Sequence, residues 1–272
     1  MDKKIVLVGL DSYANIGDTI LIDSCKFLVE KALKDNEIYD SVKIDVLDLM
    51  KTTESLKKDR DISAVNGVVS GFLTLVAERI VRSNVRLNCC VYKIKNRVKY
   101  GKYFARSLKD AKAVIFVGGA YLKFSEEEFQ YSIRHVLRTA DKHHIPVMMN
   151  AVGIEGYSEK DYRCQLMKEA INLDCVKIIT TRDDDVFLRE NFITNKSIKT
   201  AEVADAALWL EDVYKISPSY SDDLIDVGIN IAYSTLFEYN VSVNSAAGLQ
   251  AHPSRETMSR GLIDSHRVYG RI

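Results

Sequence analysis

Polar residues and glycines that could act on a ligand follow the first predicted strand. The apolar run Ile5–Gly9 leads into a loop that contains Asn15, Gly17 and Asp18. Loops of this kind, between the carboxyl end of a strand and the start of a helix, bind ligands in doubly wound α/β domains. Their backbone N–H groups favour anions, and a glycine lets the main chain approach a ligand closely. The spacing by itself favours a structural loop, in which Asn15 makes the turn and Asp18 caps the helix, so both interpretations stay open.

Glycines follow two later strands in the same way. Gly118 and Gly119 end the run Ala113–Val117, and Gly153 follows the strand Val147–Val152. A glycine pair lets the chain turn sharply and lets a ligand touch the backbone. Many α/β turns use glycine for the turn alone, so a structural role stays open for all three.

Three charged residues complete the candidate set. Arg182 and Asp183 end the strand Ile178–Thr181, and Asp205 follows the strand Ile198–Val203. Arginine is a fixed cation that suits a carboxylate or a phosphate, although an ion pair with a neighbouring loop accounts for Arg182 as well. Asp183 is expected to cap the next helix. Asp205 either positions a sugar hydroxyl or caps the short helix after it.

Several classes of site are excluded by missing motifs. The sequence has neither a G-x-G-x-x-G fingerprint nor a G-x-x-x-x-G-K-[ST] loop, so a dinucleotide or P-loop nucleotide site is unsupported. A G-x-S-x-G nucleophile elbow is absent too. The five cysteines include no C-x-x-C pair and are expected to be buried, reduced thiols. We therefore predict no metal and no resident cofactor, and we assign no catalytic acid or base.

The order of the predicted elements indicates how these loops are positioned. Short apolar strands alternate with amphipathic helices through most of residues 1–210, which predicts a doubly wound α/β domain with a mostly parallel, Rossmann-like sheet. Lys plus Arg and Asp plus Glu both number 38, and a net charge of zero argues against a nucleic-acid-coating protein. The sequence starts without a signal peptide and has no apolar run of about 20 residues. A cytoplasmic location is therefore expected.

One segment interrupts this alternation. Residues 55–108 are predicted to be a helical insertion, and its part from 79 to 106 carries nine Lys or Arg residues and no acid. The structural interpretation is an inserted helical hairpin with a solvated basic face. The functional interpretation is a surface that binds anionic partners. Such a partner could be the inner face of a membrane, in peripheral contact, or a lipid-pyrophosphate carrier. The sequence leaves both open.

The end of the chain departs from the α/β pattern. Residues 1–215 are predicted to form the α/β domain, and residues 216–240 a linker with the first strand of a second domain. Residues 241–272 show no sustained apolar period, whereas a second domain of ordinary size needs at least about 100 residues. The hypothesis is that the second domain is incomplete and that the chain ends in an irregular, unrelated or frameshifted tail.

Taken in order, the short motifs resemble the polysaccharide pyruvyl transferase family. They are N-I-G-D, V-G-G-A, V-G-I-x-G, T-T-R-D, V-A-D-A-A-L-W-L and V-G-I-N-I, and they span about residues 4–235. The resemblance implies a two-domain architecture like that of GT-B glycosyltransferases, with this domain as the N-terminal half and the site in the cleft between domains. It implies transfer of a pyruvyl group from phosphoenolpyruvate, as a ketal, to a saccharide or lipid-linked saccharide in surface or exopolysaccharide synthesis.

The resemblance also assigns residues to the substrate-binding wall of this first domain. By motif match they are Asn15, Gly17, Asp18, Gly118, Gly119, Gly153, Arg182, Asp183 and Asp205. The family's second domain carries an Arg-x-His element expected to serve phosphoenolpyruvate, and this sequence contains none, so we expect no turnover. Two alternatives stay open: a GT-B-type glycosyltransferase that uses a nucleotide sugar, and a non-catalytic protein that binds saccharide.

Overall fold

A parallel sheet is the central layer of this computed structural model, which describes residues 3–11, 16–50, 84–124 and 127–216. Its strands are β1 (Lys3–Gly9), β2 (Val42–Asp48), β3 (Ala111–Phe116), β4 (Gly119–Leu122), β5 (Val147–Ile154), β6 (Val176–Thr181) and β7 (Lys199–Glu202). They are ordered β2-β1-β3-β5-β6-β7, with the short β4 beside β5, and every pairing is parallel. The predicted doubly wound α/β fold is therefore confirmed.

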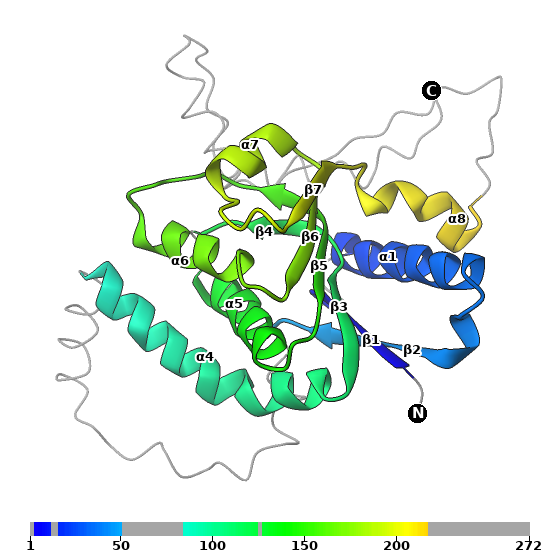
Figure 1. The fold of residues 1–272 in the computed structure, drawn as a ribbon, viewed down its shortest axis with the longest axis horizontal. Helices are drawn as coiled ribbons and strands as arrows, with labels where there is room; N and C mark the ends of the chain where they lie inside the picture. The colour runs from blue at the N-terminus through cyan, green and yellow to red at the C-terminus, as the bar shows by residue number, and fades with distance from the viewer. Residues whose placement is uncertain (1–2, 12–15, 51–83, 125–126, 217–272) are drawn as a thin grey trace, which may run out of the picture. The chain divides into compact units, whose positions relative to one another are not determined.

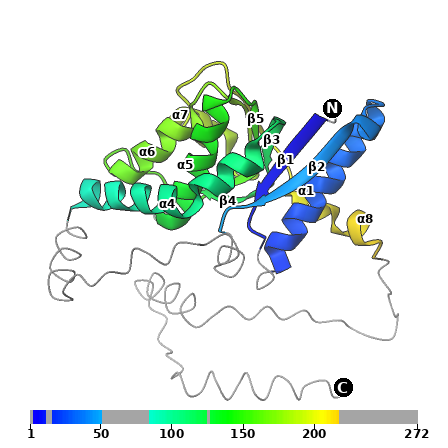
Figure 2. The same cartoon turned by 90° about the horizontal axis from the view of Figure 1, so that it is seen from below.

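Helices cover both faces of the sheet (Figures 1 and 2). The helices are α1 (Ile16–Asp35), α4 (Val85–Leu108), α5 (Glu127–Lys142), α6 (Tyr162–Ile171), α7 (Asp185–Asn191) and α8 (Leu210–Tyr214), with short 3-10 turns at Tyr39–Ser41 and Ala206–Trp209. The chain steps from β1 outward to β2, and then returns past β1 to β3. Because crossover connections are right-handed, this reversal places α1 on one face and α4, α5, α6 and α7 on the other, while α8 packs against α1.

Side-chain caps set several of the helix starts. The Oδ1 atom of Asn84 accepts a hydrogen bond from the N–H of Leu87 at 3.1 Å, which begins α4. The Oδ1 atom of Asp184 accepts from the N–H of Phe187 at 3.0 Å, which begins α7. Our prediction that Asp183 caps this helix is wrong, because Asp184 satisfies the N–H groups of the first turn.

The larger core lies between the sheet and the layer that contains α4 and α5. Phe104 and Tyr100 of α4 are buried in it, with ring centroids 5.4 Å apart. Residues 85–108 are helical, as the sequence predicts, but they form the β2–β3 crossover and part of the core. Only one face of α4 is solvated, because its aromatic residues recur at helical spacing and seal the sheet.

Other predicted features lie outside the described residues. These are Asn15, the apolar part of the predicted insertion up to residue 83, the predicted strand within 216–240 and the irregular tail 241–272. Within the part of the chain that the structure describes, no helix is long and apolar enough to cross a membrane.

Candidate functional site

The carboxyl ends of the strands bring the candidate residues to one edge of the sheet. Because all pairings are parallel, the loops after β1, β3, β5, β6 and β7 all begin at the same edge of the sheet. Gly153 lies at the carboxyl end of β5, and the other described candidates lie in these loops or at the start of the element that follows. In open parallel sheets, ligands bind at this edge, where neighbouring loops leave in opposite directions. Here that reversal point lies between β1 and β3.

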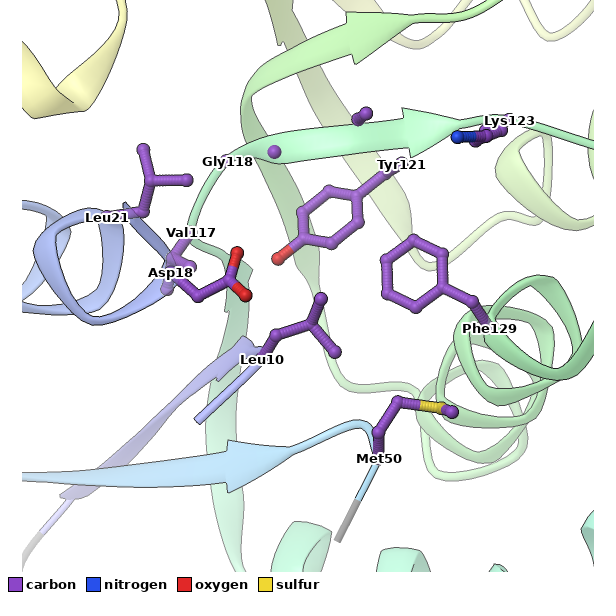
Figure 3. Close-up of a pocket in the computed structure, with 11 residues that line it drawn as sticks. Leu10, Asp18, Leu21, Met50, Val117, Gly118, Tyr121, Lys123 and Phe129 are labelled. Atoms are coloured by element: carbon purple, nitrogen blue, oxygen red, sulfur yellow. The ribbon is translucent and has the colours of Figure 1, made fainter. Parts of the chain in front are cut away.

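A cavity of about 290 Å³ lies at this reversal point (Figure 3). Leu10 and Met50 line it from the ends of β1 and β2, and Asp18 lines it from the first turn of α1. Gly118 and Gly119 line it from the turn between β3 and β4. The structure therefore brings together three of the predicted residues, from two motifs about 100 residues apart in the sequence.

The polar part of the cavity combines Asp18 with Tyr121, which sequence reasoning missed. Figure 3 shows the Asp18 carboxylate and the Tyr121 hydroxyl pointing toward one another. The hydroxyl donates a hydrogen bond to the carbonyl oxygen of Val8, with an oxygen–oxygen distance of 3.1 Å. Burial raises the pKa of Tyr121, and the charges of Cys25 and Asp18 raise it further. The phenol therefore stays protonated and can act as a hydrogen-bond donor.

The backbone conformation at positions 118 and 119 requires glycine. Their φ angles are 112° and 114°, in the region that favours glycine. A Cβ atom on Gly118 would lie 3.4 Å from the carbonyl oxygen of Asn150. In the facing part of β5, the register against β6 shifts between Met149 and Val152, and Ala151 within this stretch has a φ of 45°. The Ala151 N–H is satisfied by the Thr180 hydroxyl oxygen at 2.8 Å, so this β-bulge is a built feature of the cavity wall.

A cation closes the other end of the cavity. Lys123 lines it and forms an ion pair with Glu155, with an Nζ–Oε2 distance of 2.8 Å. Sequence reasoning missed Lys123 because it placed a helix directly after Gly118 and Gly119 and did not predict β4. The four residues of β4 are too few to show a clear two-residue period, so the sequence carried no clear signal for this strand.

A second cluster joins the ends of β5, β6 and β7. The Arg182 guanidinium forms an ion pair with Asp205, and the Asp205 carboxylate also accepts a hydrogen bond from the N–H of Ala207 at 2.8 Å. Gly153 lies beneath the guanidinium, because a Cβ atom there would be 3.0 Å from Nη2 of Arg182. Glycine therefore provides the space that the arginine occupies.

Asp183 has a structural contact in this cluster. Its Oδ2 atom accepts a hydrogen bond from the N–H of Ile154 at 2.6 Å. The Thr181 hydroxyl accepts from the N–H of Asp183 at 3.0 Å and donates to the carbonyl of Val152 at 2.8 Å. These bonds fix the β6 loop to β5, so they hold Arg182 beside Gly153.

The cavity and the second cluster adjoin at one residue. Ala120 lines the cavity, and its Cα is 3.3 Å from the position of a Cβ on Gly153. Gly17 is the exception among the described candidates: it lies at an exposed position of the first turn of α1 and does not line the cavity. The structure thus forms two adjacent groups, one around Asp18 and the glycine pair and one around Arg182.

Within the described part of the chain, the buried cysteines and the metal-binding side chains form no alternative centre. Four cysteines are buried and Cys90 is exposed, which corrects the expectation that all are buried. Burial raises the pKa of Cys25 to about 12, and the pKa of Cys175 to about 12 with a further contribution from Asp141. Protonated thiols are poor nucleophiles. Among the described residues, no group of three or more His, Cys, Asp or Glu side chains is placed to hold a metal ion.

No protein-family model matches the chain, and no curated protein matches it. The functional conclusion therefore depends on the geometry of the carboxyl edge.

Proposed function

We propose that this chain is a polysaccharide pyruvyl transferase-like protein whose carboxyl edge binds phosphoenolpyruvate and part of a saccharide acceptor, free or lipid-linked. One observation carries the proposal. Motif residues from four separate loops lie along one edge of the sheet, and they combine a small cavity with two paired cations.

The reaction requires anion binding and charge stabilisation. Protonation of the enol phosphate at C3 gives an oxocarbenium-like cation, and a first saccharide hydroxyl attacks C2. The C2–O bond to phosphate then breaks, and a second hydroxyl bonds to C2 and closes the ketal, with loss of both hydroxyl protons. Cations must therefore hold the carboxylate and the phosphate. Lys123 and Arg182 supply them in the proposal, each held by a carboxylate partner until an anionic ligand competes for it. Asp18 and the Tyr121 phenol would orient saccharide hydroxyls. We assign no catalytic acid or base.

The cavity's size favours phosphoenolpyruvate over a nucleotide sugar. Sites for drug-sized ligands enclose roughly 300–1,000 Å³, and this cavity of about 290 Å³ is at the lower end. A three-carbon phosphate ester suits that volume, whereas a nucleotide sugar extends well beyond it.

A thermal-shift titration of the full chain tests the proposal. Phosphoenolpyruvate should raise the melting temperature in a saturable way, and UDP-sugars should not. Arg182→Gln should weaken the response by about 10-fold, which corresponds to one charge-assisted hydrogen bond. Arg189→Gln is the matched control, because Arg189 is exposed on α7 and pairs within its own helix with Asp185.

Three outcomes would count against the proposal. They are no response to phosphoenolpyruvate, a response equally weakened by Arg189→Gln, and a larger response to UDP-sugars, which would favour the glycosyltransferase alternative. Phosphate release in the presence of a glycan acceptor would reject the non-catalytic alternative.

A further inference from the structure

A basic groove runs between α4 and α5, apart from the carboxyl-edge cavity. Figures 1 and 2 show the two helices side by side, and the groove between them encloses about 620 Å³. Six Lys or Arg side chains line it, namely Lys93, Arg97, Lys102, Arg134, Arg138 and Lys142. Among the residues that the structure describes, no carboxylate lines it. We refer to it as the α4–α5 groove.

At least three of these cations have no ion-pair partner among the described residues. Arg138 has Glu169 at 4.0 Å, the limit of an ion pair. Within the described ranges, Lys93, Arg97 and Lys142 have no carboxylate at ion-pair distance. Cations that face one another without counter-charges repel, and this repulsion opposes folding unless an anion lies between them.

Arg134 is the most informative of them. Its side chain lines the groove although the residue is only 4% exposed, and its Nε has no hydrogen-bond partner in the described part of the chain. The Tyr131 ring lies 5.5 Å from its guanidinium carbon. Burial lowers the pKa of Arg134, and the neighbouring Arg138 lowers it further. A buried guanidinium with an unsatisfied donor is costly in free energy, so a bound acceptor would stabilise it.

His135 presents a second polar group to the groove. Its Nδ1 lies 2.9 Å from Oδ1 of Asn96, and the Asn96 amide donates to the Ser132 hydroxyl at 2.9 Å. The Asn96 oxygen therefore accepts, so Nδ1 carries the proton. This leaves Nε2 of His135 for the groove, where a Cβ on Gly101 would be 4.0 Å away.

Gly101 keeps the floor of the groove open. It lies within α4, and a Cβ there would meet Cε1 of His135 at 3.6 Å and Cγ of Arg97 at 3.8 Å, which are ordinary contacts. Alanine would therefore fit, and glycine inside a helix costs about 0.5–1 kcal/mol relative to alanine. The packing around α4 does not require a glycine at position 101. An open groove does require it, because any side chain there would narrow the groove.

The length of the charged surface suggests the class of ligand. On α4 the cations extend over nine helical steps from Lys93 to Lys102, about 13 Å at the helical rise, and on α5 over eight steps from Arg134 to Lys142, about 12 Å. One phosphate group is too short to engage that length and too weakly charged to balance it.

We propose that the α4–α5 groove binds a diphosphate, as a soluble compound or as the headgroup of a lipid. Arg134 and Arg97 hold its oxygens from opposite helices, and Lys142 adds charge at one end. This site is independent of the phosphoenolpyruvate site, and either can fail without the other.

Calorimetric titration of the full chain with inorganic pyrophosphate is the direct test. We expect saturable binding, with weaker binding of inorganic phosphate. The double variant Arg97→Gln/Lys142→Gln changes two exposed side chains and should lower the affinity by about 10-fold or more. The matched control Lys112→Gln/Lys177→Gln removes the same charge from exposed positions on β3 and β6 and should leave the affinity unchanged.

Gly101→Ala provides a variant that should fold at least as well as the parent chain. It narrows the groove, so pyrophosphate affinity should fall while the melting temperature stays equal or rises. If the melting temperature rises and the affinity is unchanged, the role given to Gly101 is wrong. The thermal shift with phosphoenolpyruvate should survive in all these variants, which separates a failure here from a failure of the proposed function.

Flotation with vesicles separates the two sources of diphosphate. Phosphatidylcholine vesicles that carry a polyprenyl diphosphate should bind the chain, and pyrophosphate should compete, if the lipid is the source. Binding of pyrophosphate without flotation indicates a soluble diphosphate. Absence of pyrophosphate binding, equal weakening by the control variant, or preferential binding of a single-stranded RNA oligonucleotide would each overturn the proposal.

Discussion

Gly153→Ala tests whether the carboxyl edge is built around the position of one guanidinium. The new methyl group would lie 3.0 Å from Nη2 and 3.1 Å from Nε of Arg182, and 3.3 Å from Cα of Ala120. These distances are tighter than most contacts that real Cβ atoms make, so a neighbouring group must yield slightly. The backbone of Ala120 is held in β4, whereas the end of the arginine side chain is flexible. We therefore expect the Arg182 guanidinium to be displaced and its contact with Asp205 to be weakened.

The solvent exposure of the Arg182 and Asp205 side chains sets the expected energy of their interaction. The side chains of Arg182 and Asp205 are 33% and 29% exposed, so water screens their attraction, and the pair should contribute about 0.5–1 kcal/mol. Replacing glycine by alanine restricts the unfolded chain and stabilises by about 0.4–1 kcal/mol. The two effects oppose one another, so the melting temperature of Gly153→Ala should change by no more than about 2–4 °C. Overall stability is therefore a poor readout, and the coupling between the two charges is the informative one.

A double-mutant cycle measures that coupling. Arg182→Gln and Asp205→Asn are combined in the parent chain and again together with Gly153→Ala, and urea unfolding gives the free energy of each protein. Asparagine keeps an oxygen that can cap the turn at Ala207. We expect a coupling energy of about 0.5–1 kcal/mol in the parent chain and below about 0.3 kcal/mol with Gly153→Ala. An undiminished coupling energy in the second cycle would refute the steric reasoning.

Three further predictions concern backbone strain and thiol reactivity. Gly118→Ala should lower the free energy of unfolding by about 1–3 kcal/mol, because an alanine at a φ of 112° is strained, as urea denaturation will show. Ala151→Gly should raise the melting temperature, because glycine takes a φ of 45° without the roughly 1–2 kcal/mol that alanine incurs. Iodoacetamide at pH 8 should modify Cys90 and leave Cys25 intact, as read by mass spectrometry, because burial raises the pKa of Cys25 to about 12. The same pKa shift means that Cys25 contributes stability fully below pH 9 and loses it as the pH rises through about 12.

The controls for these predictions use the same types of change elsewhere in the chain. Gly101→Ala should not destabilise, so a loss of stability equal to that of Gly118→Ala would point to a general effect. Ala113→Gly, at a position of β3 without a positive φ, should destabilise, and an equal loss with Ala151→Gly would show that the bulge stores no strain. Labelling of Cys25 as fast as Cys90 would contradict the assigned burial.

Much of the fold was predictable because it depends on local patterns. Continuous apolar runs such as Val6–Val8 predict buried strands, and their alternation with helices predicts a parallel sheet. The candidate loops were predictable too, since parallel strands place their carboxyl ends at one edge. The prediction was wrong where two neighbouring residues compete for one role: Asp184 rather than Asp183 caps α7. It was incomplete where an element is short, since the four residues of β4 lack a clear period.

The sequence by itself determined which residues follow each strand, and hence which side chains reach the carboxyl edge. Only the tertiary structure decided how they divide: Asp18 with Gly118 and Gly119 around a cavity, and Arg182 with Asp205 over Gly153. It also converted a basic stretch into the α4–α5 groove. The physical reason is the separation along the chain between the residues that make each contact. Strand and helix patterns arise from contacts a few residues apart, whereas a cavity or a paired charge depends on strand order and helix packing between residues far apart in the chain.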